Sequence, residues 1–329
     1  MSDLARIAIH PSQFPDQVRR DLFDSLRTRQ VNHKFLYDSI KQTQKWLALH
    51  QAYSPSRTDP DCGATYERSF AAVPPRIGAH QVQLIGLGCG GGQKDAKLLK
   101  TLRDGGKEVF YSPSDVRTAM VLTARQTALT VIPAENCSPI VCDLASAEDL
   151  PAVLDEHSPS SAARLITFFG MLPNFEPQTI LPRLASIVRP GDYLLLSANL
   201  APGPDYAAGV RRIVPLYDNG LTRNWLMTFL LDLGVEAGDG ELRFRIEDVS
   251  AGSGLKRVAA YFHFIQPREV QLDDQKFKFA AGDSIRLFFS FRHTPVLIRE
   301  MLARHGLQVL DQWITASEEE GVFLCCRAF

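Results

Sequence analysis

The sequence lacks long hydrophobic runs, cysteine pairs with motif spacing and an excess of charge of either sign. No window approaches the roughly 18 consecutive apolar residues of a membrane-spanning helix, and the N-terminal segment lacks the apolar core of a secretory leader. Lysine and arginine total 36 against 37 aspartates and glutamates, which gives no electrostatic attraction for nucleic acid or an anionic membrane. We therefore expect a cytoplasmic protein whose partner is a small-molecule substrate, with no nucleic acid and no membrane.

Cysteine is scarce and scattered. The six cysteines are Cys62, Cys89, Cys137, Cys142, Cys325 and Cys326. None forms a CxxC pair, so neither a zinc site nor a disulfide framework is indicated, and we expect reduced thiols. The adjacent pair in the terminal strand should point to opposite faces of a sheet. No cluster of His, Asp and Glu has metal-ligand spacing, which predicts that no metal is bound.

What the sequence does contain is a regular alternation of strand and helix patterns from residue 82 onward. Strands are predicted at 82–87, 108–112, 140–142, 164–170 and 192–197, and the helices between them at 93–103, 116–129, 147–156 and 177–188. Five strands separated by four helices predict an α/β fold with a doubly wound, mostly parallel sheet.

The segments on either side of this alternation differ from it. Helices are predicted at 16–29 and from 32 to Pro55, and residues 200–286 have Pro/Gly punctuation, one helix at 225–233 and strands at 242–246, 258–265 and 277–279. This central stretch is typical of an inserted α+β region. The C-terminal segment returns to the sheet pattern, with helix 295–305 and strands 308–314 and 322–328. The acidic turn Glu318–Gly321 between those strands is predicted to be a solvated hairpin tip rather than a binding patch.

The stretch Val82–Lys94, VQLIGLGCGGGQK, combines a buried strand, a glycine turn and the start of a helix. Such a unit presents backbone N–H groups to a nucleotide-like ligand. Gly86, Gly88 and Gly91 satisfy GxGxxG, so a nicotinamide dinucleotide, S-adenosylmethionine and a purely structural turn are all compatible with the glycines alone.

Two further features favour S-adenosylmethionine. The predicted sheet closes with an antiparallel hairpin, as in class I methyltransferases, where a dinucleotide domain would continue with a second similar half. Asp115 and Asp143 follow consecutive strands, where one carboxylate can accept the ribose hydroxyls and the other the adenine amino group. Each acid alone is also compatible with a helix N-cap.

These motifs together resemble a known family. GLGCGGGQKDAKLL, YSPSDV, VCDL, FFGMLPNF, PGDYLLL and FAAGDSIRLFFSFRHTP, with the upstream FLYD and YSPSR, are similar to the L-histidine Nα-methyltransferases of ergothioneine biosynthesis. The resemblance implies a class I methyltransferase-like sheet with an antiparallel terminal strand and an inserted α+β substrate domain. The S-adenosylmethionine-binding domain is expected at 60–199 and 287–329, and the substrate-binding cap at 1–59 and 200–286.

The resemblance also implies site residues. The cofactor-binding residues are expected to be Gly86, Gly88, Cys89, Gly90, Lys94, Asp115, Val116, Asp143, Leu144 and Gly170, with Lys94 holding the methionine carboxylate. The substrate-binding residues are expected to be Tyr37, Tyr53, Asn174, Phe288 and Ser290, of which Tyr53 and Asn174 hold the reacting amine and are the expected catalytic pair.

The chain departs from the family pattern at four places. Gly86 stands where the family usually has Glu, and Asp95 stands where it has Thr. The loop 170–174 is one residue shorter. Phe288 replaces a Glu that accepts a hydrogen bond from the substrate imidazole, although Ser290 is kept. A buried imidazole N–H left unpaired costs about 1–3 kcal/mol, so histidine is not expected to be the preferred substrate.

We therefore predict an S-adenosylmethionine-dependent N-methyltransferase acting on the α-amino group of a small apolar or aromatic amino acid or related amine. Tyr37 is expected to help bind a carboxylate, and Phe288 to form an apolar side-chain pocket. Two alternatives remain open from the sequence. The acceptor can be an O, S or N atom of a larger natural product, or the chain can be a non-catalytic S-adenosylmethionine-binding relative. His293, close to Ser290, is expected to be a structural histidine.

Overall fold

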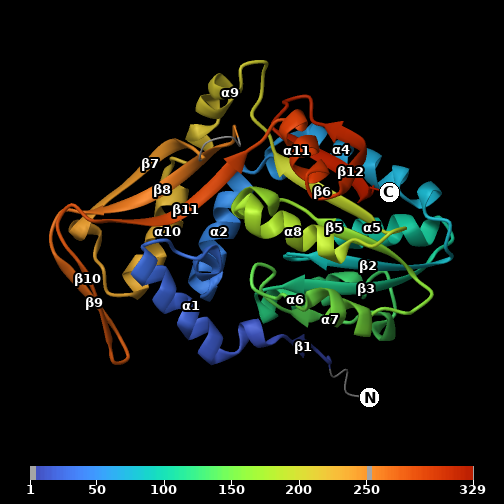
Figure 1. Ribbon diagram of the computed structural model, residues 1–329, viewed down its shortest axis with the longest axis horizontal. Coiled ribbons are helices and arrows are strands. Elements are labelled where there is room, and N and C mark those ends of the chain that lie inside the picture. Colours follow the sequence, from blue (N-terminus) through green and yellow to red (C-terminus); the bar gives the residue numbers. More distant parts are fainter. Residues whose placement is uncertain (1–4, 250–253, 329) are drawn as a thin grey trace.

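The structure, a computed structural model, describes residues 5–249 and 254–328 and is built around an eight-stranded sheet (Figure 1). In spatial order its strands are β1 (Ala8–Ile9), β4 (Ile140–Val141), β3 (Glu108–Asp115), β2 (Gln81–Leu87), β5 (Ala163–Phe168), β6 (Tyr193–Asn199), β13 (Glu320–Arg327) and β12 (Leu307–Ile314). All neighbours up to β6 pair in parallel, and β13 is antiparallel to both β6 and β12. The α/β class and the reversed terminal strand are confirmed.

The central strands are apolar on both faces because helices cover both sides of the sheet. In β2, Val82 and Leu84 belong to one buried cluster and Ile85 and Leu87 to another, as the alternation of side chains along a strand requires. The helices around the sheet are α4 (Pro60–Ala72), α5 (Gln93–Asp104), α6 (Thr118–Ala128), α7 (Leu150–Glu156), α8 (Pro177–Ile187) and α11 (Pro295–Ala303). Short 3-10 turns link several of them: η3 (Pro74–Arg76), η4 (Ala134–Asn136) and η5 (Leu172–Asn174).

A second body of structure lies at one end of the molecule. It holds the antiparallel sheet β11 (Ser284–Arg292), β8 (Lys256–Phe264) and β7 (Gly240–Asp248), and the hairpin β9 (Arg268–Leu272) and β10 (Gln275–Phe279). Its helical elements are η1 (Pro11–Gln13), α1 (Pro15–Thr28), η2 (His33–Tyr37), α9 (Tyr206–Arg212), η6 (Val214–Leu216), α10 (Gly220–Asp232) and η7 (Ala237–Asp239). Side chains from α1, η2, α10 and these strands form a third buried cluster. The expected domain boundary at 286/287 falls inside β11, and the division of the chain into two domains stays a prediction.

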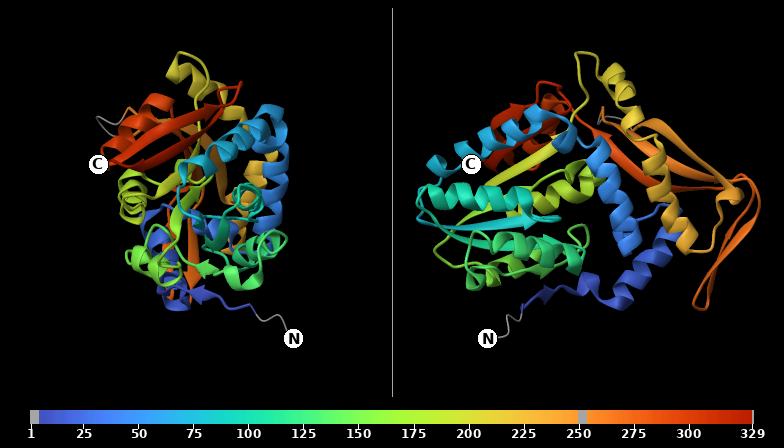
Figure 2. Two further views of the ribbon diagram at one scale, coloured as in Figure 1. Left: turned by 90° about the vertical axis from the view of Figure 1, so that its right-hand side faces the viewer. Right: turned by 180° about the vertical axis from the view of Figure 1, so that it is seen from behind.

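The helix expected from residue 32 to Pro55 is interrupted, which corrects the sequence prediction. The 3-10 turn η2 ends at Tyr37, and α2 (Ile40–Tyr53) begins after Ser39. Ser39 and Gln42 form a reciprocal capping box that satisfies N–H groups at the start of α2, so the chain begins a new helix there. The short α3 (Pro55–Thr58) then leads into α4. In Figures 1 and 2, α2 lies between the eight-stranded sheet and the three-stranded sheet of β7, β8 and β11.

The acidic hairpin tip was predicted correctly only in part, because Glu318 is exposed but Glu320 is buried. Glu320 is 5% exposed rather than solvated, because it starts β13 beside α4 and meets the side chains of Tyr66 and Cys62. All six cysteines are free, and Cys325 is buried while Cys326 is partly exposed, as expected for opposite faces. Within residues 5–249 and 254–328, no helix is long and apolar enough to cross a membrane.

Candidate active site

The glycine turn after β2 forms an open backbone cradle. Gly88, Gly90 and Gly92 have φ values of 64°, 52° and 73°, a region that glycine adopts without steric cost. A Cβ built on Gly90 would meet no atom within 4 Å, whereas one on Gly92 would lie 2.8 Å from the Ala124 Cα. The N–H of Cys89 donates to the carbonyl of Ser114, which fastens the turn to β3. The turn is therefore closely packed against α6 and open at Gly90.

Asp115, the last residue of β3, faces this turn. Its Oδ2 accepts the Gly90 N–H at 3.1 Å and its Oδ1 accepts the Arg117 N–H at 3.1 Å. Burial raises the pKa of Asp115, and these two hydrogen bonds oppose that shift. The Arg117 guanidinium turns away to Asp38 and the carbonyl of Lys34. A carboxylate has about four lone-pair sites, so Asp115 keeps capacity to accept two further hydroxyls.

Asp143 follows β4 but is held by protein groups on both oxygens. Its Oδ1 accepts the Ala145 N–H at 3.0 Å and its Oδ2 accepts the Lys34 ammonium at 3.0 Å. Lys34 comes from η2, is 1% exposed and also pairs with Asp21 at 2.5 Å. Lys34 was not predicted as a partner of Asp143, because no local pattern links residue 34 to residue 143. The N-terminal segment is thereby tied to the strand edge where adenine binding was predicted.

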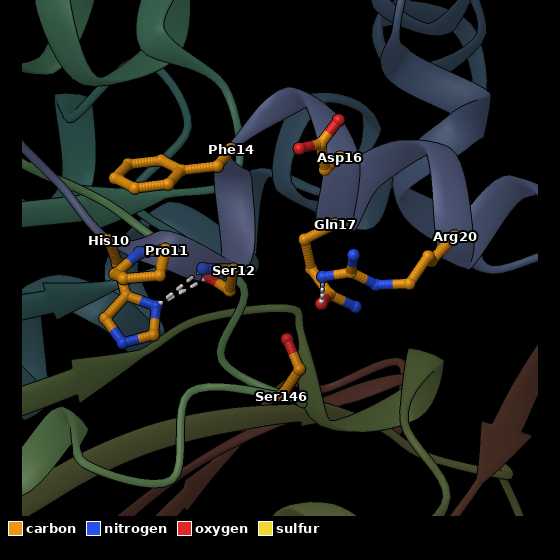
Figure 3. A pocket seen from close by; sticks show the side chains of 8 residues that line it. All are labelled: His10, Pro11, Ser12, Phe14, Asp16, Gln17, Arg20 and Ser146. Atoms are coloured by element: carbon orange, nitrogen blue, oxygen red, sulfur yellow. Dashed lines mark hydrogen bonds between the residues drawn. The ribbon is translucent and has the colours of Figure 1, made fainter.

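A cavity of about 400 Å³ lies beside the loop that follows Asp143 (Figure 3). It is lined by η1, the start of α1 and Ser146, and none of the predicted site residues lines it. Ser12 contacts the His10 ring on one side and accepts the Asp143 N–H on the other. One lining residue of this cavity, Ser12, therefore helps to hold the loop that follows Asp143.

Lys94 lies on the first turn of α5, at the other end of the cradle. Its Nζ donates to the Tyr66 hydroxyl at 2.7 Å, sits 3.9 Å from the centre of the Tyr66 ring and lies 3.9 Å from a Glu320 oxygen. Its side chain is 35% exposed, so the ammonium keeps donor capacity for a ligand carboxylate. Tyr66 and Glu320 were not predicted, because each reads in sequence as an ordinary packing or turn residue.

The two departures from the family pattern at Gly86 and Asp95 are linked, because the two residues compete for the same space. A Cβ added to Gly86 would lie 2.3 Å from the Asp95 Oδ2 and 3.1 Å from the Tyr111 hydroxyl. Asp95 is 3% exposed, and its two oxygens accept the Tyr111 hydroxyl at 2.6 Å and the Thr167 hydroxyl at 2.8 Å. The carboxylate on α5 thus fills the space that a side chain on β2 would need.

Asp95 makes stability depend on pH. Burial raises its pKa from 3.8 to about 6, so the folded protein binds this proton more tightly than the unfolded chain and loses that stabilisation as pH rises from about 4 to 6. Asp95→Asn removes this titration. We expect the free energy of unfolding of the variant, relative to the unmodified protein, to rise by up to about 3 kcal/mol between pH 4 and 7. Urea unfolding across that range measures it, and a difference that does not change with pH would contradict it.

The predicted acceptor residues come from both bodies of the molecule. Tyr37 is packed between Trp46 and Trp225, with ring centroids 5.5 Å from each, and both burial and the charge of Asp115 raise the pKa of Tyr37. Asn174 ends η5, and in the described part of the chain its side-chain amide makes no hydrogen bond. Tyr53 ends α2 and is partly exposed. The roles of all three stay predictions.

Strand β11 packs along η5 and brings Phe288, Ser290 and Arg292 to one face. The Phe288 ring lies 5.9 Å from Tyr217 and 5.8 Å from Trp225, and the Ser290 hydroxyl is 2.9 Å from the Tyr217 hydroxyl. Tyr217 was not predicted from the sequence as a residue of this site. This face of β11 is therefore an aromatic wall, and its one retained serine already has a partner.

Arg292 is a buried cation on this wall. It is 3% exposed, and its Nη atoms donate to the Leu200 carbonyl at 3.0 Å and the Tyr217 hydroxyl at 2.9 Å. Within the described residues no carboxylate pairs with it, and its Nε has no partner. A buried guanidinium held only by neutral groups favours an anion nearby.

The two histidines beside this region are neutral packing residues. Burial lowers the pKa of His293 to about 4, and its backbone N–H donates to the Asn199 carbonyl, which fits the expected structural role. Burial also lowers the pKa of His33 to about 4, and its ring packs edge-on to Phe175. Neither is charged near neutral pH. In the described ranges, no group of three or more His, Cys, Asp or Glu side chains could hold a metal ion.

The donors and acceptors around the turn fit S-adenosylmethionine. The backbone is open at Gly90, Asp115 supplies hydroxyl acceptors, and Lys94 supplies an ammonium for a carboxylate. Gly170, with φ 71° and no atom within 4 Å of an added Cβ, gives a second open backbone position at the end of β5. Lys94 thus suits the carboxylate of the methionine part of the ligand, and Asp115 suits the hydroxyls of its ribose.

Comparison with known proteins agrees with this chemistry. Residues 16–327 match the model of a family described as histidine-specific, SAM-dependent methyltransferases. The chain is 25% identical over 335 residues to a histidine N-alpha-methyltransferase of Mycobacterium tuberculosis, covering 94% of this chain and 95% of that protein. A crystal structure of a possible exported protein from Bordetella parapertussis resembles it with TM-score 0.50 and 12% identity, covering 96% of this chain and 99% of that one. The CcbJ methyltransferase from Streptomyces caelestis does so with TM-score 0.41 and 13% identity, covering 82% and 96%. The structural likeness concerns the fold alone.

Proposed function

Since the chain belongs to the family of histidine-specific, SAM-dependent methyltransferases, we propose that it methylates the α-amino group of an apolar or aromatic amino acid in preference to histidine. The observation that carries this proposal is Phe288, which packs against Tyr217 and Trp225 where the family pattern has an imidazole acceptor. Ser290 is already hydrogen-bonded to Tyr217, and Phe288 offers an imidazole N–H no carboxylate acceptor. A hydrocarbon or aromatic side chain gains from the same wall.

The anionic part of the acceptor is proposed to interact with Tyr217 and Arg292. The phenol accepts a hydrogen bond from the guanidinium, which leaves its own hydrogen free for either Ser290 or a ligand carboxylate. Arg292 adds positive charge that no described carboxylate offsets. Tyr37 remains a proposed second contact. An amino acid, which carries both an amine and a carboxylate, fits this wall better than a simple amine.

Methyl transfer depends mainly on how the acceptor amine is positioned relative to the methyl group. When bound, S-adenosylmethionine supplies an electrophilic methyl group on its sulfonium. The free amide of Asn174 and the hydroxyl of Tyr53 are proposed to orient the acceptor amine, whose ordinary pKa near 8 leaves a neutral fraction at pH 7 without a strong base. Gly170 and the glycine turn let the main chain approach closely, and the aromatic residues of the cap exclude water. Orienting two reactants in this way can supply several kcal/mol of the barrier reduction.

A panel of amino acids tests the proposed function. With S-adenosylmethionine present, we expect S-adenosylhomocysteine to form fastest with phenylalanine, tyrosine, tryptophan or an aliphatic amino acid, and more slowly with histidine. The methyl ester of the best substrate should react less well, because it lacks the carboxylate. Calorimetry should rank the same compounds in the same order. Tight binding of histidine, with no binding of phenylalanine, tyrosine or tryptophan, would overturn the proposal.

Substitution of Phe288 by glutamate should shift the preference toward histidine. The new carboxylate gives the imidazole N–H an acceptor, worth about 1–3 kcal/mol, so the ratio of kcat/KM for histidine to that for phenylalanine should rise by about 10-fold or more. Phe288→Leu is the matched control, since it removes the ring without adding an acceptor. An equal ratio of kcat/KM for histidine to that for phenylalanine in the glutamate and leucine variants would show that position 288 does not determine which substrate side chain is preferred.

A further inference from the structure

A buried polar network joins the two ends of the candidate active site. It lies where α4, β6 and β13 meet, and its central members are Tyr66, Ser197 and Glu320, which are between 0% and 5% exposed. The Tyr66 hydroxyl is 2.7 Å from the Ser197 Oγ and also bonds a carboxylate oxygen of Glu320. Burial and the charge of Glu320 raise the pKa of Tyr66, so the phenol keeps its hydrogen.

The number of hydrogens fixes the direction of this network. A phenol has one hydrogen, and the Glu320 carboxylate accepts it. The Ser197 hydroxyl can then give its own hydrogen to the phenol oxygen, while the Ser197 oxygen accepts the Gly170 N–H at 2.9 Å. The Lys94 ammonium donates to the same phenol oxygen at 2.7 Å. The Tyr66 oxygen therefore stands between a lysine and, through one serine, a backbone amide.

The two ends of the network serve different ligands in the proposed function. Lys94 is the proposed partner of the methionine carboxylate, and Gly170 begins the loop that leads through η5 to Asn174. The Tyr66 ring is fixed by Phe70 and Phe169, with centroids 5.8 and 5.4 Å away, so the hydroxyl cannot move far without moving these rings. A change in the Lys94 contact therefore alters the hydrogen bond between the phenol oxygen and Ser197 while the Tyr66 ring stays in place.

We propose that the Tyr66 hydroxyl is a positioning group that couples the two sites: occupation of the cofactor site at Lys94 orders the acceptor loop 170–174 through Tyr66 and Ser197. This inference rests on the proposed function, because it takes Lys94 as a cofactor contact. Tyr66 itself touches neither ligand in this account and acts through its two neighbours. The chemistry of methyl transfer is unaffected, but the amine is presented correctly only when the cofactor is in place.

Tyr66→Phe tests the coupling, because it removes the hydroxyl and keeps the ring. In the unmodified protein, S-adenosylhomocysteine should slow amide hydrogen exchange in the peptide covering residues 169–175. In Tyr66→Phe, its affinity by calorimetry should fall about tenfold, the factor that one hydrogen bond to a charged group contributes. At saturating S-adenosylhomocysteine the extra protection of the loop should be lost. Tyr193→Phe is the matched control, since that hydroxyl bonds the Arg76 carbonyl at the opposite end of β6, and it should behave like the unmodified protein.

Ser197→Ala separates coupling from binding, and it also serves if Tyr66→Phe does not fold. It leaves the contact between Lys94 and Tyr66 intact, so S-adenosylhomocysteine should bind within about twofold of the unmodified protein, yet the ligand-dependent protection of residues 169–175 should disappear. Full protection of the loop at saturating ligand in either variant would overturn the proposal. Failure of S-adenosylhomocysteine to bind the unmodified protein would overturn the proposed function as well.

Discussion

Replacing Asp115 with alanine should weaken the binding of S-adenosylhomocysteine about 100-fold or more. Both printed hydrogen-bond partners of the Asp115 carboxylate are backbone N–H groups, so its remaining lone pairs are available to a ligand. Two ribose hydroxyls bound to a charged acceptor contribute about 1.5–3 kcal/mol each. The substitution also leaves the Gly90 and Arg117 N–H groups without their acceptor, which loosens the turn itself.

Calorimetric titration measures this effect directly. Asp104→Ala is the control, because Asp104 ends α5, the helix that follows the glycine turn, is solvent-exposed and pairs with the neighbouring Lys100 and Arg103 side chains. Asp115→Asn should fall between the two, since an amide oxygen accepts hydrogen bonds without charge. A far-UV circular dichroism spectrum shows whether each variant is folded. If folded Asp115→Ala bound the ligand within threefold of the unmodified protein, Asp115 would not be a ribose contact.

The second large effect concerns Gly86 and Asp95, the two positions where the family usually has Glu and Thr. Gly86→Glu should destabilise the protein by at least about 3 kcal/mol, because it drives a second carboxylate into the buried space that Asp95 fills. Asp95→Thr in the same chain removes the obstructing carboxylate. The double variant should recover most of the loss, with a coupling energy of about 2 kcal/mol or more.

Urea unfolding of the four proteins in this cycle gives the coupling energy. Gly78→Glu is the matched control, since a Cβ at Gly78 would meet no atom within 4 Å and its φ is not positive. It should cost far less than Gly86→Glu, and Asp95→Thr should not change its effect. Additive effects of Gly86→Glu and Asp95→Thr would mean that the two positions act independently. The claim that Asp95 fills the space needed by a side chain at position 86 would then be wrong.

The arrangement of the central sheet followed from the sequence because its signals are local. Buried parallel strands such as β2 are apolar on both faces and alternate with amphipathic helices, and the acids at the ends of β3 and β4 are placed by that alternation alone. The reversed strand β13 was predicted from the hairpin pattern. These features need no knowledge of which distant residues meet.

The contacts that the sequence did not reveal join distant segments. Glu320 looks like part of a polar turn, but a tyrosine 254 residues earlier buries it. Lys34 looks like a surface lysine, but Asp21 and Asp143 both pair with it. Tyr217 became visible only when β11 placed Ser290 and Arg292 beside it. In each case the burial of a polar group decides its role, and burial depends on how the inserted segments pack against the sheet.

A crystal structure of the protein with S-adenosylhomocysteine tests the central claim most directly. The ribose hydroxyls should lie within hydrogen-bonding distance of Asp115, the homocysteine carboxylate should contact the Lys94 ammonium, and the sulfur should face the space between Asn174 and Phe288. An adenosine bound away from the glycine turn, with Asp115 still holding only its two backbone partners, would contradict this account of the site.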